Sequence, residues 1–178
     1  MGKHALRNRA LFVVGLNTGF RISELLSLNL GDVYQKGRVV DRVTVLRRNV
    51  KGKTASRTIV LNQIAKSTLL PYVQSLLDTS ETAETPLFFG MYRGKSRLTR
   101  KQAWKILQDA FAEAQIQGNL GTHTMRKTFA RVMYAALSFR IEKLQRLLGH
   151  KWISSTVAYI DGIDEGLEEA VLTHQVGT

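Results

Sequence analysis

The chain has no cysteine among its 178 residues, which excludes disulfides, thiolate metal ligands and a cysteine nucleophile. Its 4 histidines form no HExxH-like pair, so we predict no metal site and no cofactor. No apolar run approaches the roughly 18 residues that a membrane span needs. The N-terminus is basic and then apolar but lacks a small-residue cleavage site, so we predict no signal peptide and no membrane partner.

Acidic side chains are also scarce, because 14 Asp and Glu stand against 26 Lys and Arg and leave a net charge of +12. This balance favours a polyanionic partner, most often a nucleic acid, over a basic surface kept for solubility. Residues 1–60 carry 12 basic and 3 acidic side chains, whereas the residues after Tyr159 carry 5 acidic ones and no Lys or Arg. We therefore expect a nucleic-acid face to form from the basic part and to repel the acidic tail.

Hydrophobic patterning predicts a mainly helical α+β domain with one small antiparallel sheet. Helical spacing of apolar residues covers 5–16, 22–30, 64–78, 99–116, 122–137 and 139–148, and a last helix begins near Ser154 or Ser155. Alternating β-branched residues predict the sheet between Arg38 and Leu61. Ser23 and Thr99 are candidate N-caps, and Gly149 is the expected helix stop. One apolar face of the helix over 99–116 is shared by Trp104, Leu107, Ala110 and Phe111.

Three polar segments carry residues whose chemistry stands out. Arg21 follows a glycine at the start of a helix, where the helix dipole disfavours a cation, so it needs an anion, either an acidic neighbour or a phosphate. His123 and Arg126 lie three residues apart on one helix face, a spacing that is also common on solvated helix surfaces. Lys53 lies between the two predicted strands, where a solvated charge is the simpler interpretation.

His150 and Tyr159 are nine residues apart, which on one continuous helix amounts to about 900° and places them on opposite faces. A shared site therefore requires a break between them. Gly149 can end one helix, and Ser154 or Ser155 can cap the next, so the sequence supplies that break. Tyr159 then lies on a separate short helix.

The chain resembles the catalytic domain of tyrosine recombinases, the phage-integrase and Xer-like site-specific recombinases, in four segments that keep the order and spacing of the family: TGFRISELLSLNLGDV, KTASRTIVL, HTMRKTF and LLGHKWISSTVAYI. The family's helix before the HxxR box is similar to RLTRKQAWKILQDAFAEAQI, so the resemblance covers almost the whole chain. It implies a mainly helical catalytic domain with a small sheet, and site-specific DNA recombination of the kind found in mobile genetic elements.

By this resemblance, the chain cleaves and rejoins DNA through a covalent 3′-phosphotyrosine intermediate and needs no metal. The implied site has Tyr159 as the nucleophile, Arg21 and Arg126 on the scissile phosphate, His123 and His150 on that phosphate or on the tyrosine proton, and Lys53 as the general acid for the 5′-oxygen. Guanidinium suits phosphate because it stays charged and matches two oxygens at once. Since free tyrosine has a pKa of about 10, the reaction needs proton handling near neutral pH.

The lysine of the implied site has two candidates. Lys53 fits the KTxxxRxIxL version of the motif found in integrases, and Lys51 fits the KGxxK version found in Xer-like members. We favour Lys53. Lys127 departs from the family pattern, because many relatives have a second histidine there, but this position varies within the family.

The resemblance also implies a domain organisation and partners. Residues 1–178 correspond to the catalytic domain, and because only 20 residues precede Arg21, we expect a fragment or a truncated protein without the family's N-terminal DNA-clamping domain. The implied partners are double-stranded DNA and other protomers, as a tetramer on DNA and a monomer when free. The implied location is the cytoplasm, in a bacterial, phage or plasmid context. We expect the acidic tail over 160–178 either to dock on a neighbouring protomer or to pack on its own molecule.

Three other interpretations compete with the recombinase. A type IB topoisomerase shares the arginines, the lysine and the tyrosine, but the spacing from LGH to tyrosine and the small size favour a recombinase. A catalytically silent DNA-binding or accessory module of the same fold conflicts with the presence of all the expected polar residues. A generic basic helical domain, with RNA as its partner, requires every motif to be a coincidence.

Overall fold

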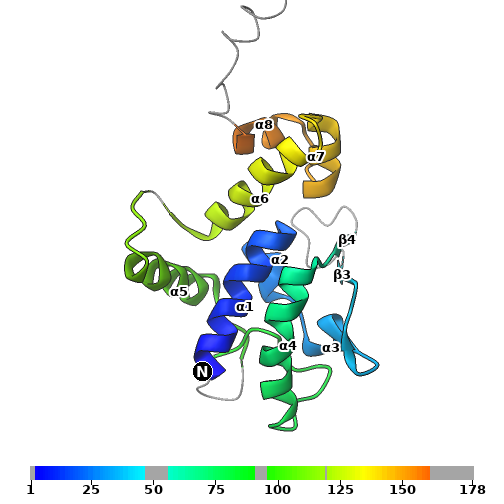
Figure 1. Ribbon diagram of the computed structural model, residues 1–178, viewed down its shortest axis with the longest axis vertical. Coiled ribbons are helices and arrows are strands. Elements are labelled where there is room, and N and C mark those ends of the chain that lie inside the picture. Colours follow the sequence, from blue (N-terminus) through cyan, green and yellow to red (C-terminus); the bar gives the residue numbers. More distant parts are fainter. Residues whose placement is uncertain (1–2, 47–55, 91–95, 119, 161–178) are drawn as a thin grey trace, which may run out of the picture. The chain divides into compact units, whose positions relative to one another are not determined.

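The computed structural model describes residues 3–46, 56–90, 96–118 and 120–160 (Figure 1). Its helices are α1 (Lys3–Thr18), α2 (Ile22–Leu26), α3 (Leu30–Val33), α4 (Gln63–Leu77), α5 (Arg100–Glu113), α6 (Thr122–Ala136), α7 (Ile141–Leu148) and α8 (Ser154–Ile160). Its strands are β1 (Tyr34–Gln35), β2 (Arg38–Val39), β3 (Arg42–Val45) and β4 (Arg57–Val60). The predicted class, mainly helical with a small antiparallel sheet, is confirmed. The chain divides within α6 into two compact units, Met1–Phe129 and Ala130–Thr178.

The core of the first unit forms where α1 packs against α4, and the two helices run side by side in Figure 1. Leu11 and Val14 of α1, like Leu69 and Val73 of α4, are at most 1% exposed. Each helix therefore buries one apolar stripe and leaves its polar face outside. Burial of each such side chain stabilises the fold by about 1.5–3 kcal/mol. This pair of helices is therefore a stable part of the first unit.

Within the described residues, the predicted sheet consists of two separate antiparallel pairs instead of one sheet. β1 pairs with β2 and begins before the predicted limit of Arg38. β3 pairs with β4 in a register that places Val45 opposite Arg57. The Val40 N–H donates to the carbonyl of Val33 at 2.9 Å and so extends the contacts of the first pair.

The helix predicted over 22–30 is wrong in length, because α2 has only 5 residues. The N-cap prediction for Ser23 is also wrong. Arg21 takes the N-cap position, and the carboxylate of Glu24 reaches back to accept the Arg21 N–H at 2.9 Å. At the other end of α2, the Ser27 N–H donates to the Glu24 carbonyl at 3.1 Å. This bond joins residues three apart, as in a 3₁₀ turn, and ends the helix early.

α5 is amphipathic, but its buried face is not the predicted one. Ala103, Leu107 and Phe111 are buried, whereas Trp104 is 47% exposed and Ala110 is exposed. The prediction for Trp104 and Ala110 is therefore wrong. The three buried residues are four positions apart and lie along one edge of the helix, so the side chains of Trp104 and Ala110 point away from the core.

Thr99 caps α5 as predicted. Its hydroxyl accepts the Gln102 N–H at 3.2 Å, and the Gln102 side chain accepts the Thr99 N–H at 2.8 Å. Thr99→Ala is expected to lower the free energy of unfolding by about 1 kcal/mol, because a backbone N–H loses its partner. Urea unfolding measures this loss. Thr99→Ser keeps the hydroxyl and should retain most of the stability, and an equal loss in both variants would contradict the cap.

In the second unit, α7 packs against α8. Gly149 ends α7 as predicted, in the left-handed conformation with φ of 65°. α8 begins at Ser154, so the predicted break between His150 and Tyr159 is confirmed. None of the helices within the described ranges is long and apolar enough to cross a membrane.

Candidate functional site

The turn between α1 and α2 places Arg21 at the start of α2. Thr18 ends α1, and its hydroxyl donates to the carbonyl of Val14 at 2.7 Å. Gly19 follows with φ of 57°, and a Cβ at this position would lie 2.2 Å from the Phe129 ring. Only glycine fits here without strain, so the chain can reverse tightly and present Arg21 as the N-cap of α2.

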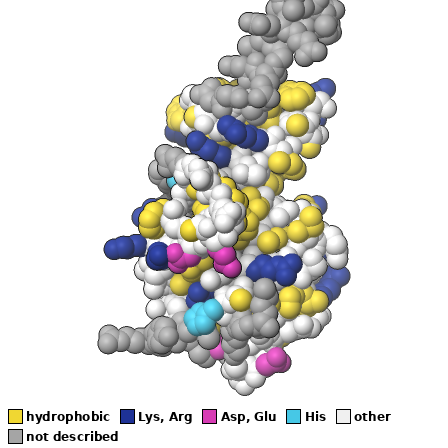
Figure 2. All heavy atoms as spheres, turned by 60° about the vertical axis from the view of Figure 1, so that its left-hand side comes forward, with side chains coloured by type: hydrophobic (Ala, Val, Ile, Leu, Met, Phe, Trp, Pro, Cys, Tyr) yellow, Lys and Arg dark blue, Asp and Glu magenta, His cyan; other side chains and the backbone are white. Residues whose placement is uncertain are grey.

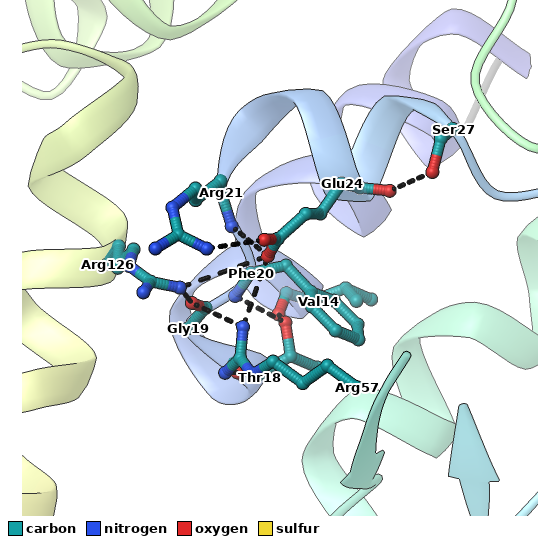
Figure 3. Close-up of polar contacts among 9 residues, drawn as sticks. All are labelled: Val14, Thr18, Gly19, Phe20, Arg21, Glu24, Ser27, Arg57 and Arg126. Atoms are coloured by element: carbon teal, nitrogen blue, oxygen red, sulfur yellow. Dashed lines mark hydrogen bonds and ion pairs between the residues drawn. The ribbon is translucent and has the colours of Figure 1, made fainter. Parts of the chain in front are cut away.

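The carboxylate of Glu24 lies among three guanidinium groups, and we call these four residues the Glu24 cluster (Figure 3). Arg21 Nη1 lies 2.7 Å from Oε1, Arg57 Nη1 lies 3.1 Å from Oε2, and Arg126 Nη1 lies 3.9 Å from Oε2. Glu24 is fully buried. Its charge therefore depends on these cations instead of water, and it joins α2, β4 and α6 within the first unit.

The arginines of the cluster differ in exposure. The side chain of Arg21 is 19% exposed, whereas that of Arg126 is 1% exposed. Arg126 Nη1 also donates to the carbonyl of Gly19, so the turn before Arg21 holds it in place. Arg21 can thus meet a ligand from solvent, while Arg126 is fixed by the fold.

Arg57 joins β4 to the same turn. Besides Glu24, its guanidinium donates to the carbonyl of Thr18 at 3.3 Å and lies over the Phe20 ring, 5.2 Å from the centroid. Burial lowers the pKa of Arg57 to about 10, and nearby Arg21 adds to this while Glu24 opposes it. Since that pKa lies well above neutrality, Arg57 keeps its charge at pH 7.

In the part of the chain that the structure describes, three guanidiniums face the single carboxylate of Glu24. The sequence predicted that Arg21 needs an anion, and Glu24 is the acidic neighbour that meets this need. One carboxylate offsets one of these three positive charges, so the four side chains by themselves favour a further anion. A phosphodiester, with a single negative charge and two non-bridging oxygens, suits such a site.

Sequence reasoning assigned no role to Glu24 or Arg57. The signal for Glu24 was present, because a glutamate three residues after a helix start is the pattern that caps the backbone. Arg57 occupies an inward position of β4, which alternates buried and exposed residues. A charged residue at a buried strand position needs a partner, and that is the signal that could have found it.

In the second unit, the rings of His150 and Tyr159 lie together, with centroids 5.1 Å apart and an interplanar angle of 60°. His150 Nδ1 lies 3.0 Å from the hydroxyl of Thr156, which is fully buried on α8. The break between α7 and α8 thus joins two side chains that one continuous helix would separate. An imidazole beside a phenol can take or return its proton.

The other predicted site residues are His123 and the two candidate lysines. His123 lies on α6, and its side chain is exposed. Lys51 and Lys53 fall between β3 and β4 in the sequence and lie outside the described residues. The acidic tail from residue 161 onward also lies outside them.

Comparison with known proteins gives consistent matches. The model of the phage integrase family matches residues 2–165. The chain is 34% identical over 164 residues to the probable integrase/recombinase YoeC of Bacillus subtilis, a match that covers 92% of this chain and 82% of YoeC. It is 34% identical to the tyrosine recombinase XerD of Mycobacterium leprae, over 89% of this chain and 49% of XerD. It is 30% identical to XerC of Caldanaerobacter subterraneus subsp. tengcongensis, over 93% of this chain and 44% of XerC.

The chain therefore spans about half the length of these two Xer relatives. Among solved structures, XerA recombinase aligns with a TM-score of 0.78 and 23% identity, over 98% of this chain and 60% of XerA. XerH bound to palindromic difH substrate, in a post-cleavage complex, aligns with a TM-score of 0.78 and 24% identity, over 97% of this chain and 47% of XerH. At these identities the likeness shows a shared fold.

Proposed function

The chain belongs to the phage integrase family, and from this premise we propose that it is a tyrosine recombinase that cleaves and rejoins DNA at specific sites. The observation that carries the proposal is the convergence of Arg21 and Arg126 on the buried carboxylate of Glu24. This arrangement holds two guanidiniums in place before any phosphate arrives. Donors that are already oriented stabilise charge developing in a transition state without reorganising.

In the cleavage step, Tyr159 Oη attacks the scissile phosphorus, so a bond forms between Oη and phosphorus while the bond from phosphorus to the 5′-oxygen breaks. The phenol proton passes to His123 or His150. The 5′-oxygen takes a proton from Lys53, with Lys51 as the second candidate. The products are a 3′-phosphotyrosine and a free 5′-hydroxyl. Because the phosphodiester energy is kept in the covalent bond, attack by a 5′-hydroxyl can rejoin DNA without ATP.

The basic surface supports double-stranded DNA as the partner. Figure 2 shows Lys and Arg side chains spread over the visible face. On α5, Arg100, Lys101 and Lys105 are exposed next to Trp104. Such side chains contact phosphates without reading the base sequence, so they would add affinity that falls with salt.

The proposal extends to the assembly. Residues 1–178 would act as a catalytic domain together with other protomers on DNA, in the cytoplasm of a bacterial, phage or plasmid context. The tail over 160–178 is acidic, and negative charge near DNA is unfavourable. A protein surface, on a neighbouring protomer or on the same molecule, is therefore the better location for the tail.

A library of nicked duplexes with randomised sequence tests the proposal, because it offers the protein many candidate recognition sites at once. The short strand released after cleavage diffuses away, so the covalent adduct accumulates. We expect the wild-type chain to form adducts that survive denaturation and are enriched in a subset of sequences. Mass spectrometry of the digested adduct should place the nucleotide on Tyr159.

Tyr159→Phe is the matched control, because it keeps the ring beside His150 and lacks only the hydroxyl. It should give no adduct from the same library. Equal adduct yields from wild type and Tyr159→Phe, or none from either, would contradict covalent catalysis. Either result would favour a DNA-binding module of the same fold without catalytic activity.

A further inference from the structure

We infer that Thr156 is a positioning residue, whose hydroxyl orients the imidazole of His150 so that Nε2 is the nitrogen that serves the reaction. The inference rests on the proposed function, in which His150 contacts the scissile phosphate or handles the tyrosine proton. It begins from a contact within the second unit: the Thr156 hydroxyl lies 3.0 Å from His150 Nδ1.

The backbone of His150 is fixed on both sides. Its N–H donates to the carbonyl of Gln145 at 3.1 Å, and the side-chain amide of Gln145 donates to the His150 carbonyl at 3.2 Å. With the main chain held, rotation of the ring is the freedom that matters for chemistry. The hydrogen bond to Thr156 restrains that rotation.

The burial of Thr156 makes this contact strong. Thr156 is 0% exposed, so bulk water does not compete for its hydroxyl. Its backbone N–H donates to the carbonyl of Ile153 at 2.7 Å, which places it in the first turn of α8. A threonine in this helix has few rotamers, so the hydroxyl keeps its direction.

The bond also gives the two ring nitrogens different roles. In a neutral imidazole, the partner of one nitrogen decides which nitrogen carries the proton. The Thr156 hydroxyl can donate to a bare Nδ1 or accept from a protonated Nδ1, and the ring keeps the same orientation in either case. In both states Nδ1 of His150 is engaged by Thr156, and Nε2 is the nitrogen that meets the phosphate or the phenol. Partners of this kind orient reacting groups without touching the substrate.

Thr156 further couples His150 to the nucleophile. It lies three residues before Tyr159 on α8, whereas His150 follows the end of α7. The hydrogen bond therefore ties the imidazole to the helix that carries the phenol, and it maintains the ring separation of 5.1 Å between His150 and Tyr159. The orientation of the imidazole therefore depends on the position of α8.

Substitutions at Thr156 separate this role from packing. Thr156→Val keeps the shape and removes the hydroxyl, whereas Thr156→Ser keeps the hydroxyl and removes a methyl group. Thr156→Ala removes both and favours the helix, so it replaces the valine variant if valine prevents folding.

The first readout needs no DNA. Imidazole 15N chemical shifts are recorded for the four histidines, and the signals of His150 are assigned by their loss in His150→Gln. We expect wild type and Thr156→Ser to share the same His150 shifts, because both keep the hydroxyl that engages Nδ1. In Thr156→Val the His150 shifts should move toward the tautomer-averaged values of an exposed imidazole.

The second readout is the single-turnover rate of adduct formation on a duplex selected from the library. Thr156→Val should slow it about tenfold, the effect of one buried hydrogen bond, and Thr156→Ser should restore most of the rate. In a His150→Gln background, Thr156→Val should have no further effect, because the residue acts through His150.

Unchanged His150 shifts and an unchanged rate in Thr156→Val would overturn the inference. An equal rate loss from Thr156→Val in both the wild-type and His150→Gln backgrounds would also overturn it and would assign Thr156 to packing. If the shifts move as expected but the wild type forms no adduct, Thr156 still positions His150 and the proposed function fails.

Discussion

Arg21→Ala is expected to lower the single-turnover rate of DNA cleavage by about 10³-fold, while the dissociation constant for the same duplex rises only severalfold. The negative charge on the non-bridging oxygens increases as the pentacovalent transition state forms, so a guanidinium contributes more there than in the bound ground state. Arg21 is the better choice for this test because its side chain is 19% exposed, whereas Arg126 is 1% exposed and also supports the turn at Gly19. Quenched-flow measurement of adduct formation at saturating DNA, with binding measured separately, gives both numbers.

Arg100→Ala is the matched control, because it removes an exposed arginine of α5 that lies outside the Glu24 cluster. It should weaken binding modestly and reduce the slope of affinity against salt, as loss of one phosphate contact does. Its cleavage rate at saturating DNA should stay near that of the wild type. If Arg21→Ala lost binding and cleavage to the same extent, Arg21 would be a binding contact without a special role in the transition state.

The parts of the site that the sequence predicted are those governed by local rules. Arg21 at a helix start was expected to need an anion because of the helix dipole, and Glu24 supplies one within the first turn of α2. Gly149 was expected to end α7, and its φ of 65° shows why glycine stands there. The predicted break between His150 and Tyr159, which a shared site requires, followed from the same glycine and the serines after it.

The parts that the sequence did not predict depend on contacts between distant segments. Arg57 binds the carboxylate of Glu24, which lies 33 residues earlier in the sequence. No local pattern relates this strand position to that helix start. The buried face of α5 was misassigned for the same reason. Helical spacing shows which residues share a face, but the neighbouring segments decide whether Trp104 is exposed. Thr156 is six residues from His150 in the sequence, but the turn between α7 and α8 determines whether the two side chains meet.

Glu24→Ala is expected to lower the free energy of unfolding by about 3–5 kcal/mol, because it leaves buried guanidiniums without their counter-charge. Arg57 is 8% exposed and Arg126 is 1% exposed, so water cannot replace the carboxylate at either side chain. A loss of this size is a large fraction of the roughly 5–15 kcal/mol that stabilise a typical domain. Urea unfolding followed by circular dichroism measures it, with Glu113→Ala at an exposed helical glutamate as the matched control.

A second pair of variants separates the missing charge from the missing volume. Glu24→Gln keeps the size of the side chain and an acceptor for the Arg21 N–H, so it should lose stability mainly through the absent charge. Arg57→Met, added to Glu24→Gln, removes a buried cation that no longer has its carboxylate and should recover part of that loss. The two changes would then be strongly non-additive. If Glu24→Gln unfolds at the same urea concentration as the wild type, the cluster is held by shape and hydrogen bonds, and the charge of Glu24 serves only to position Arg21 for phosphate.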